Sequence, residues 1–288
     1  MSWMERLCRT YDNCAGEIAG ATAVSTDGKH VRMPLLPICH TTQIANIEIT
    51  VNIEGDWVDR TARRLDKAEG VTVIPCTENS AGRTSGLEPH PLFDKLQYLA
   101  GDYLAFGGTP KRFGYPLYMK KLRAWCASPF SHPAVRAVLA YLEKGRLIAD
   151  LVGEGILECG EDGKLLDKRP EDQFQAFVRF SVLEKDDRLL RLYEDEEVRE
   201  SFIRYQTALM GGKDICYVYG CPLPRSGTAP AKLRNSGDKA KLISSNDTNS
   251  NMLTYKGRVS ESWQAVSISF EAMQKSHNAL KWLISRQG

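Results

Sequence analysis

Alternation of apolar and polar residues along "NIEITVNIEGDW" (residues 46–57) constrains the fold most. The apolar members fall on one side of an extended chain and the polar members on the other: Ile47, Ile49, Val51 and Ile53 against Glu48, Thr50, Asn52 and Glu54. A period of two is typical of a β-strand with one face on a core. The pattern therefore predicts a strand here, with the first set inward and the second outward.

Other segments add helices and further strands. Apolar positions at helical spacing, with caps, predict helices near residues 2–15, 91–106, 116–128, 131–145, 194–212 and 270–287. Strand patterns lie near 24–33 (a hairpin), 70–76, 172–183, 214–220, 241–244, 253–259 and 263–269. This order predicts an α+β fold with mixed, largely antiparallel sheets in one large, irregular domain. Its expected sub-modules are 1–110 (α/β), 111–213 (mostly helical) and 214–288 (strands and a closing helix).

The distribution of charge points to a polyanionic partner. The chain carries a net charge of only +2, yet residues 103–142 contain no acid. They contain these bases: Lys111, Arg112, Lys120, Lys121, Arg123 and Arg136. Basic blocks of this kind fit nucleic acid. The alternative is that they pair within the fold with the acidic segment 151–210.

Three polar loops are candidates for contact with nucleic acid: "ENSAGRTSG" (78–86), "FGGTPKRFG" (106–114) and "KLISSNDTNSN" (241–251). Small residues let a backbone approach a ligand, and Arg, Lys and Asn supply phosphate or groove contacts. In 106–114 the bases suit phosphate and the aromatics suit base stacking. Taken singly, an ordinary surface loop explains the segments 78–86 and 106–114 about as well. The candidate residues are Asn79, Arg83, Thr84, Ser85, Lys111, Arg112, Lys120, Lys121, Lys241, Ser245, Asn246, Asn249, Lys256 and Arg258.

Signals for enzymatic chemistry are weak. No nucleophile elbow, phosphate-binding glycine loop or zinc-protease helix is present. "GEGILECGEDG" (153–163) is glycine-rich but acidic, so it predicts turns rather than a phosphate site. Cys216 and Cys221 could be half of a zinc site, but buried thiols fit better because no second pair exists. We therefore expect no catalytic residues, metal or cofactor.

The eight cysteines are scattered, no secretory signal precedes them, and no apolar run approaches the ~18 residues that a membrane helix needs. These features predict a cytoplasmic protein without a membrane partner.

The C-terminal segment is similar to a motif of a known protein family. "AKLISSNDTNSNMLTYKGRV", followed by "QAVSISFEAMQKSHNALKWLISRQG", resembles the signature of the large subunit of the type I-C CRISPR surveillance complex (Cascade). "RTSGLEPHPLFDKLQYLAGD" (83–102) is similar to a second motif of that family. The resemblance implies that residues 1–288 are the N-terminal, PAM- and DNA-recognising region of a longer subunit, without its C-terminal helical bundle.

The same resemblance implies a role without catalysis. Such subunits contact the crRNA 5′ handle and other surveillance-complex subunits, recognise the PAM in target double-stranded DNA, promote duplex opening and work with a recruited helicase-nuclease. We therefore expect duplex and PAM contacts on the loops 79–86, 111–112 and 241–251. The closest motif matches are Arg83, Lys241, Ser245, Asn246 and Asp247. Asp247 would fix its loop. A metal-dependent nuclease using Asp186, Asp187 and Asp247, or a protein-only adaptor, are the alternatives.

Overall fold

A computed structural model describes residues 2–18, 23–24, 31–32, 34–83, 86–168, 171–234, 238, 240–243, 264 and 266–285. Its helices and largely antiparallel sheets confirm the predicted α+β class. Within the described residues, no helix combines the length and apolarity needed to cross a membrane.

The helices and strands alternate irregularly along the chain. The α-helices are α1 (Trp3–Ile18), α2 (Glu78–Ala81), α3 (Leu96–Leu99), α4 (Tyr115–Cys126), α5 (Pro133–Glu143), α6 (Leu147–Gly153), α7 (Glu196–Ala208) and α10 (Phe270–Ile284), and the 3-10 helices are η1 (Pro110–Arg112) and η2 (Gln173–Gln175). The strands are β1 (Ala23–Val24), β2 (Val31–Arg32), β3 (His40–Ile44), β4 (Ile47–Asn52), β5 (Arg63–Arg64), β6 (Val71–Pro75), β7 (Asp94–Lys95), β8 (Asp167–Lys168), β9 (Glu171–Asp172), β10 (Phe177–Leu183), β11 (Leu189–Arg191), β12 (Lys213–Ile215) and β13 (Pro222–Pro224).

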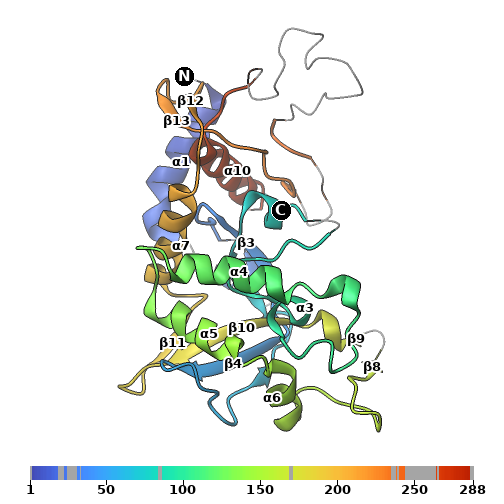
Figure 1. Cartoon of the computed structure of the whole chain (residues 1–288). Coiled ribbons are helices and arrows are strands. Elements are labelled where there is room, and N and C mark those ends of the chain that lie inside the picture. Colours follow the sequence, from blue (N-terminus) through green and yellow to red (C-terminus); the bar gives the residue numbers. More distant parts are fainter. Residues whose placement is uncertain are drawn as a thin grey trace. The chain divides into compact units, whose positions relative to one another are not determined.

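The chain forms two compact units, residues 40–205 and residues 1–39 with 206–288 (Figure 1). In the first unit a sheet runs in the order β11-β10-β4-β5, and β7 also pairs with β10. Only the central pair among these strands is parallel, with Val178 opposite Ile47 and Leu183 opposite Asn52. The division into sub-modules at residues 110 and 213 stays a prediction.

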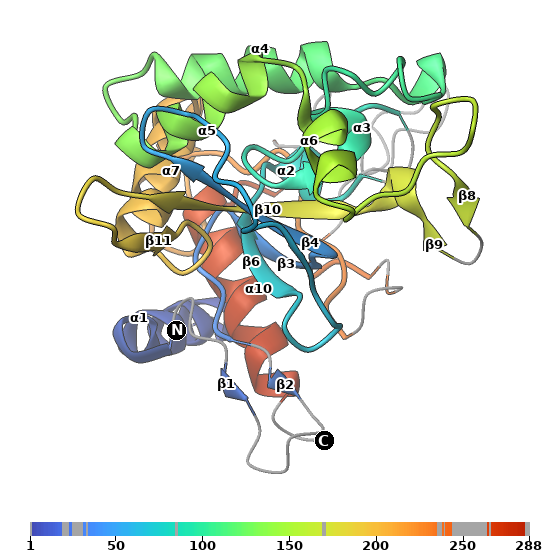
Figure 2. The same cartoon turned by 90° about the horizontal axis from the view of Figure 1, so that it is seen from below.

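The strand predicted at 46–57 is β4, but the outward orientation of Glu48 and Thr50 is wrong. Both side chains are buried. Figure 2 shows α4 and α5 on one side of β4 and β10, and the antiparallel pair β3–β6 on the other. Ile47 and Ile49 are fully buried as predicted. Because both faces of β4 are covered, its polar side chains need partners inside the protein.

The helix predicted at 91–106 is mostly absent. Only α3 is α-helical there, because Ala100 adopts an extended backbone and ends it. The chain then turns so that the carboxylate of Asp102 accepts hydrogen bonds from the backbone of Ile148 (3.2 Å) and Ala149 (2.9 Å) at the start of α6. Asp102 thus satisfies amide groups that would otherwise lack acceptors. The apolar residues of the predicted face, among them Leu96 and Tyr103, are nevertheless buried.

In the unit formed by residues 1–39 and 206–288, α1 packs along α10. Ser2 accepts a hydrogen bond from the backbone of Glu5 (3.2 Å), as a helix N-cap does. Lys275 of α10 reaches back to α1, with its Nζ 2.7 Å from Asp12 Oδ1. The predicted hairpin near 24–33 pairs as β1 and β2, with Val24 opposite Val31.

Candidate nucleic-acid interface

Two adjacent cations stand on the surface at η1. Pro110 opens this short helix, and the backbone of Arg112 donates to the carbonyl of Thr109 (2.9 Å). The side chains of Lys111 and Arg112 are both exposed. Neither forms an ion pair within the described part of the chain. Two uncompensated charges on one turn are suited to bind phosphate groups.

Glycines and aromatic rings hold η1 in place. A Cβ added to Gly108 would lie 2.2 Å from the ring of Tyr103, and one added to Gly114 would lie 2.3 Å from the ring of Tyr98. Phe113 stacks 6.2 Å from Tyr103, centroid to centroid. These rings are used to pack the loop, so the geometry favours the phosphate contact predicted for residues 106–114 over base stacking.

The remaining bases of residues 103–142 differ in their availability. Lys120 is exposed on α4, whereas Lys121 forms an ion pair with Glu88. Arg123 pairs with Glu143 at 2.8 Å, and Arg136 donates to Ser131 Oγ at 2.7 Å. Among the described residues, the carboxylates that pair with Lys121 and Arg123 therefore lie outside the acidic segment 151–210. The bases at Lys111, Arg112 and Lys120 are left for an external anion.

Arg83 has a partner inside the fold. Its guanidinium donates two hydrogen bonds to the carboxylate of Asp94, at 2.7 and 2.6 Å, and a third to the carbonyl of Glu88 at 2.8 Å. It also lies 4.9 Å from the centroid of the Tyr98 ring. Asp94 is fully buried. A nucleic-acid contact by Arg83 stays a prediction, and it would have to share this guanidinium with Asp94.

The other predicted residues are placed only in part. Asn79 is exposed on α2, next to the Thr77–Ser80 capping box. Lys241 is exposed and donates from Nζ to Thr228 Oγ1 at 2.7 Å. The remaining candidates lie outside the described residues: Thr84, Ser85, Ser245, Asn246, Asn249, Lys256 and Arg258, and with them Asp247.

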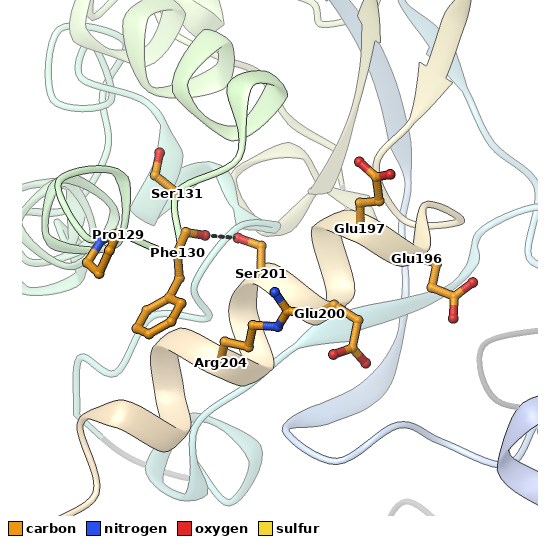
Figure 3. A pocket seen from close by; sticks show the side chains of 8 residues that line it. All are labelled: Pro129, Phe130, Ser131, Glu196, Glu197, Glu200, Ser201 and Arg204. Carbon is orange, nitrogen blue, oxygen red and sulfur yellow. Dashed lines mark hydrogen bonds between the residues drawn. The ribbon is translucent and has the colours of Figure 1, made fainter.

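A pocket of about 510 Å³ lies elsewhere in the 40–205 unit, between the α4–α5 loop and α7 (Figure 3). Glu196, Glu197 and Glu200 line it with Arg204 and Phe130. Its frame is fixed by the Ser201 hydroxyl, which donates to the Phe130 carbonyl and accepts from Trp125 Nε1 at 3.1 Å. Three carboxylates and one guanidinium line this pocket, so its net charge is negative and repels phosphate. The pocket is therefore not a candidate site for nucleic acid.

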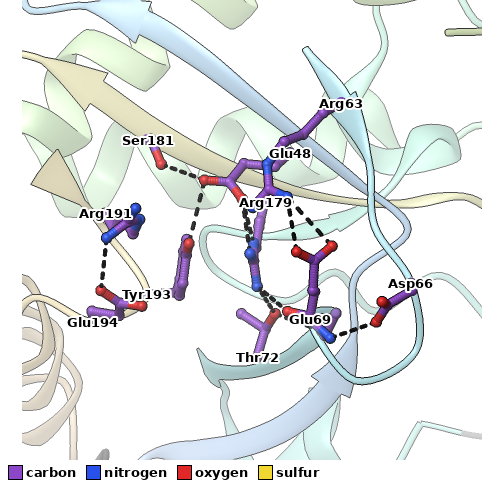
Figure 4. A network of polar contacts seen from close by, with 11 residues as sticks. Glu48, Arg63, Asp66, Glu69, Thr72, Arg179, Ser181, Arg191, Tyr193 and Glu194 are labelled. Atoms are coloured by element: carbon purple, nitrogen blue, oxygen red, sulfur yellow. Dashed lines mark hydrogen bonds and ion pairs between the residues drawn. The ribbon is translucent and has the colours of Figure 1, made fainter. Parts of the chain in front are cut away.

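The polar residues of β4 and β10 form a buried network rather than an open site (Figure 4). The carboxylate of Glu48 accepts hydrogen bonds from Arg179 (2.8 Å), Arg63 (2.9 Å), Ser181 (2.9 Å) and Tyr193 (3.3 Å). Arg179 continues the network to the carbonyl of Glu69 at 2.9 Å. Since its oxygens are so fully hydrogen-bonded, Glu48 stabilises the fold and has no free acceptor for a substrate.

The residues considered for metal chemistry are described in part, because Asp247 lies outside the described residues. No group of three His, Cys, Asp or Glu side chains converges on a possible metal position among the described residues. Asp186 and Asp187 lie in the turn between β10 and β11. Cys216 is buried and its sulfur accepts from the backbone of Ser269 at 3.3 Å, while Cys221 is exposed. The prediction of a buried thiol is confirmed for Cys216 and wrong for Cys221.

Comparison with known proteins gives one clear result. No curated protein matches the chain. The family model of the CRISPR-associated protein Cas_Csd1 matches residues 7–288, which include η1, the Arg83–Asp94 pair and the C-terminal motif. Because the match covers nearly the whole chain, this protein belongs to the Cas_Csd1 family of CRISPR-associated proteins.

Proposed function

We propose that this chain is the DNA-recognising part of the large subunit of a type I-C crRNA-guided complex, and that it acts without catalysis. It recognises the PAM in duplex DNA, contacts the crRNA 5′ handle region and promotes opening of the duplex. Its partners are the other subunits of the complex and a recruited helicase-nuclease. Membership of a CRISPR-associated family supports the CRISPR context of this proposal.

The observation that carries the DNA-binding part is the pair Lys111 and Arg112. Both are exposed, and neither is neutralised by a described acid. Their backbone is fixed by Pro110 and by the packing of Gly108 on Tyr103. A preorganised pair of cations binds phosphate at a smaller entropic cost than a loop that must first be ordered. Sequence would then be read mainly by pairing between guide and target, as in other guided effectors.

The proposal is tested with the double variant Lys111→Gln/Arg112→Gln. The complex is reconstituted with this chain, its partner subunits and guide RNA, and binding to labelled duplex DNA with and without a PAM is measured across a salt series. Loss of two phosphate contacts lowers the slope of log K against log salt by about 1.8. Affinity for DNA falls accordingly, while assembly of the complex is unchanged.

The matched control is Lys185→Gln/Arg188→Gln. It also removes one lysine and one arginine from the surface of the 40–205 unit, but these two pair with Glu54 and Glu184. We expect the control to bind DNA as the unsubstituted complex does. An unchanged affinity and salt slope for Lys111→Gln/Arg112→Gln would contradict the proposed contact. Cleavage of duplex DNA by the purified chain with magnesium would contradict the non-catalytic role and favour the nuclease alternative.

A further inference from the structure

A turn that the sequence predicts to repel phosphate lies against the basic loop. Cys159 and Leu165 form an antiparallel bridge, and Gly160 donates to the carbonyl of Lys164 at 2.9 Å. The backbone of Leu165 then donates to the carbonyl of Phe106 at 3.1 Å. This bond joins residues 159–165 to the loop that leads into η1.

The side chain of Lys164 lies across Gly107. A Cβ built on Gly107 would meet Cδ, Cβ and Cγ of Lys164 at 3.0, 3.1 and 3.2 Å. Gly107 also has a φ of +92°, which side-chain-bearing residues rarely adopt. Glycine thus makes room for the aliphatic stem of the lysine. The result is a third basic residue beside the loop that carries Lys111 and Arg112.

Lys164 is held only weakly by its acidic neighbour. Its Nζ is 3.6 Å from Asp162 Oδ2, and the two side chains are 59% and 62% exposed. Exposed pairs at such distances contribute little to stability, since water screens them and two long side chains must be ordered. A phosphate group can therefore replace Asp162 as the partner of Lys164 at small cost.

We propose that Lys164 belongs to the same phosphate-binding surface as Lys111 and Arg112, and that Asp162 competes with nucleic acid for it. The ligand is the phosphate backbone of duplex DNA. Asp162 then lowers affinity by a small factor, because binding replaces the weak Lys164–Asp162 pair. The inference rests on the proposed function and adds to it a residue from a segment whose acidic composition hides it in the sequence.

Two single variants test this inference in the reconstituted complex. Lys164→Gln removes the cation, and we expect the salt slope to fall by about 0.9 with a several-fold loss of affinity for duplex DNA at low salt. Asp162→Asn removes the competing charge but keeps the side-chain oxygen that accepts from the Lys164 backbone at 3.1 Å, so the turn is retained. For Asp162→Asn we expect a several-fold gain in affinity.

The control is Lys185→Gln, which removes another exposed lysine (83% exposed, against 59% for Lys164) whose partner Glu54 lies at a similar 3.5 Å. The inference is overturned if Lys164→Gln behaves like this control, or if Asp162→Asn does not tighten binding. If only Lys111→Gln/Arg112→Gln weakens binding, the proposed DNA contact stands and the role of Lys164 does not. If neither variant weakens binding, the proposed contact at η1 is wrong as well.

Discussion

Glu48 and Arg179 are opposite one another in the parallel pair β4–β10, and their side chains form a buried ion pair at 2.8 Å. The exposed fractions of the two side chains are only 6% and 4%. Arg179 also lies 3.9 Å from the centroid of the Tyr193 ring, and it donates to Thr72 of β6 at 3.1 Å. The pair therefore connects the two central strands of the sheet to β6, which pairs with β3 in the small sheet that covers them (Figure 4).

Replacing Arg179 by methionine should strongly destabilise the fold. The carboxylate of Glu48 would remain buried without its main counter-charge, and breaking a buried pair in this way costs about 3–5 kcal/mol. The measurement is the free energy of unfolding in urea. Lys185→Met is the control, because its exposed pair with Glu54 contributes ~0–1 kcal/mol. Equal losses of unfolding free energy in both variants would show that the buried pair stabilises the fold no more than the exposed pair does.

The same network predicts a loss of stability in acid. Burial by itself raises the pKa of Glu48, but hydrogen bonds and charge from Arg179, together with Ser181, hold it below the usual 4.5. The unfolded state then binds the proton more readily, so this contribution is present above pH 4.5 and is lost as the pH falls toward the lower folded pKa. Unfolding of Glu48→Gln between pH 5 and 3 should depend less on pH than unfolding of the parent protein. Parallel curves would contradict this assignment.

The alternation in β4 predicted the strand correctly but gave the wrong environment for one of its faces. A period of two shows that two faces differ, and it does not show what covers the polar one. The partner of Glu48 is Arg179, which is 131 residues away in the sequence. The prediction of a helix at 91–106 was wrong for a similar reason. Asp102 caps α6, and local periodicity cannot reveal this contact between distant residues.

The main effect of Arg83→Met should be a loss of folding stability rather than a direct loss of a DNA contact. Asp94 is fully buried, and the substitution removes two of its hydrogen bonds together with the opposing charge. A loss of about 3–5 kcal/mol is expected for an uncompensated buried carboxylate. Thermal unfolding and DNA affinity are measured on the same preparation, with Lys185→Met as the control, because Lys185 is exposed and forms only a surface pair with Glu54. Normal stability with weakened DNA binding would instead support the nucleic-acid contact predicted for Arg83.

Gly108→Ala should disturb the loop that carries the two exposed cations. The new Cβ would lie 2.2 Å from the Tyr103 ring and 2.6 Å from its carbonyl oxygen. Overpacking of this kind costs roughly 1–3 kcal/mol and displaces the backbone. We expect a lower melting temperature and weaker DNA binding. Gly153→Ala is the control, since its Cβ meets nothing within 4 Å, and a similar loss there would contradict the steric explanation.

Charge and composition predicted where cations of the candidate interface lie, but they did not predict which of these cations have partners in the fold. The acid-free stretch predicted cations near η1, and Lys111 and Arg112 are exposed there. The sequence could not show that Lys121 pairs with Glu88. Lys164 was missed because its neighbours are acidic, and its contact with Gly107 arises only from the fold. The one local signal for that contact was a glycine pair at residues 107–108.

His277 should make the stability of the unit formed by residues 1–39 and 206–288 depend on pH in a different range. Burial, with a smaller effect of Lys281, lowers the pKa of this histidine from 6.5 to about 4. Its Nδ1 has no hydrogen-bond partner in the described structure. Protonation would place an unpaired charge on a side chain that is only 4% exposed.

The lowered pKa of His277 determines the direction in which stability changes with pH. Between pH 6.5 and 4 the unfolded chain binds a proton at His277 that the folded protein excludes, so stability falls as the pH falls through this window. The full shift corresponds to roughly 3 kcal/mol. In His277→Gln this part of the dependence disappears, as measured by urea unfolding at half-unit steps from pH 7.5 to 4.5. Glu48 contributes its pH dependence mainly below pH 4.5, outside the measured range, so Glu48→Gln should leave the profile from pH 7.5 to 4.5 unchanged. A His277→Gln profile parallel to that of the parent would contradict the buried neutral histidine.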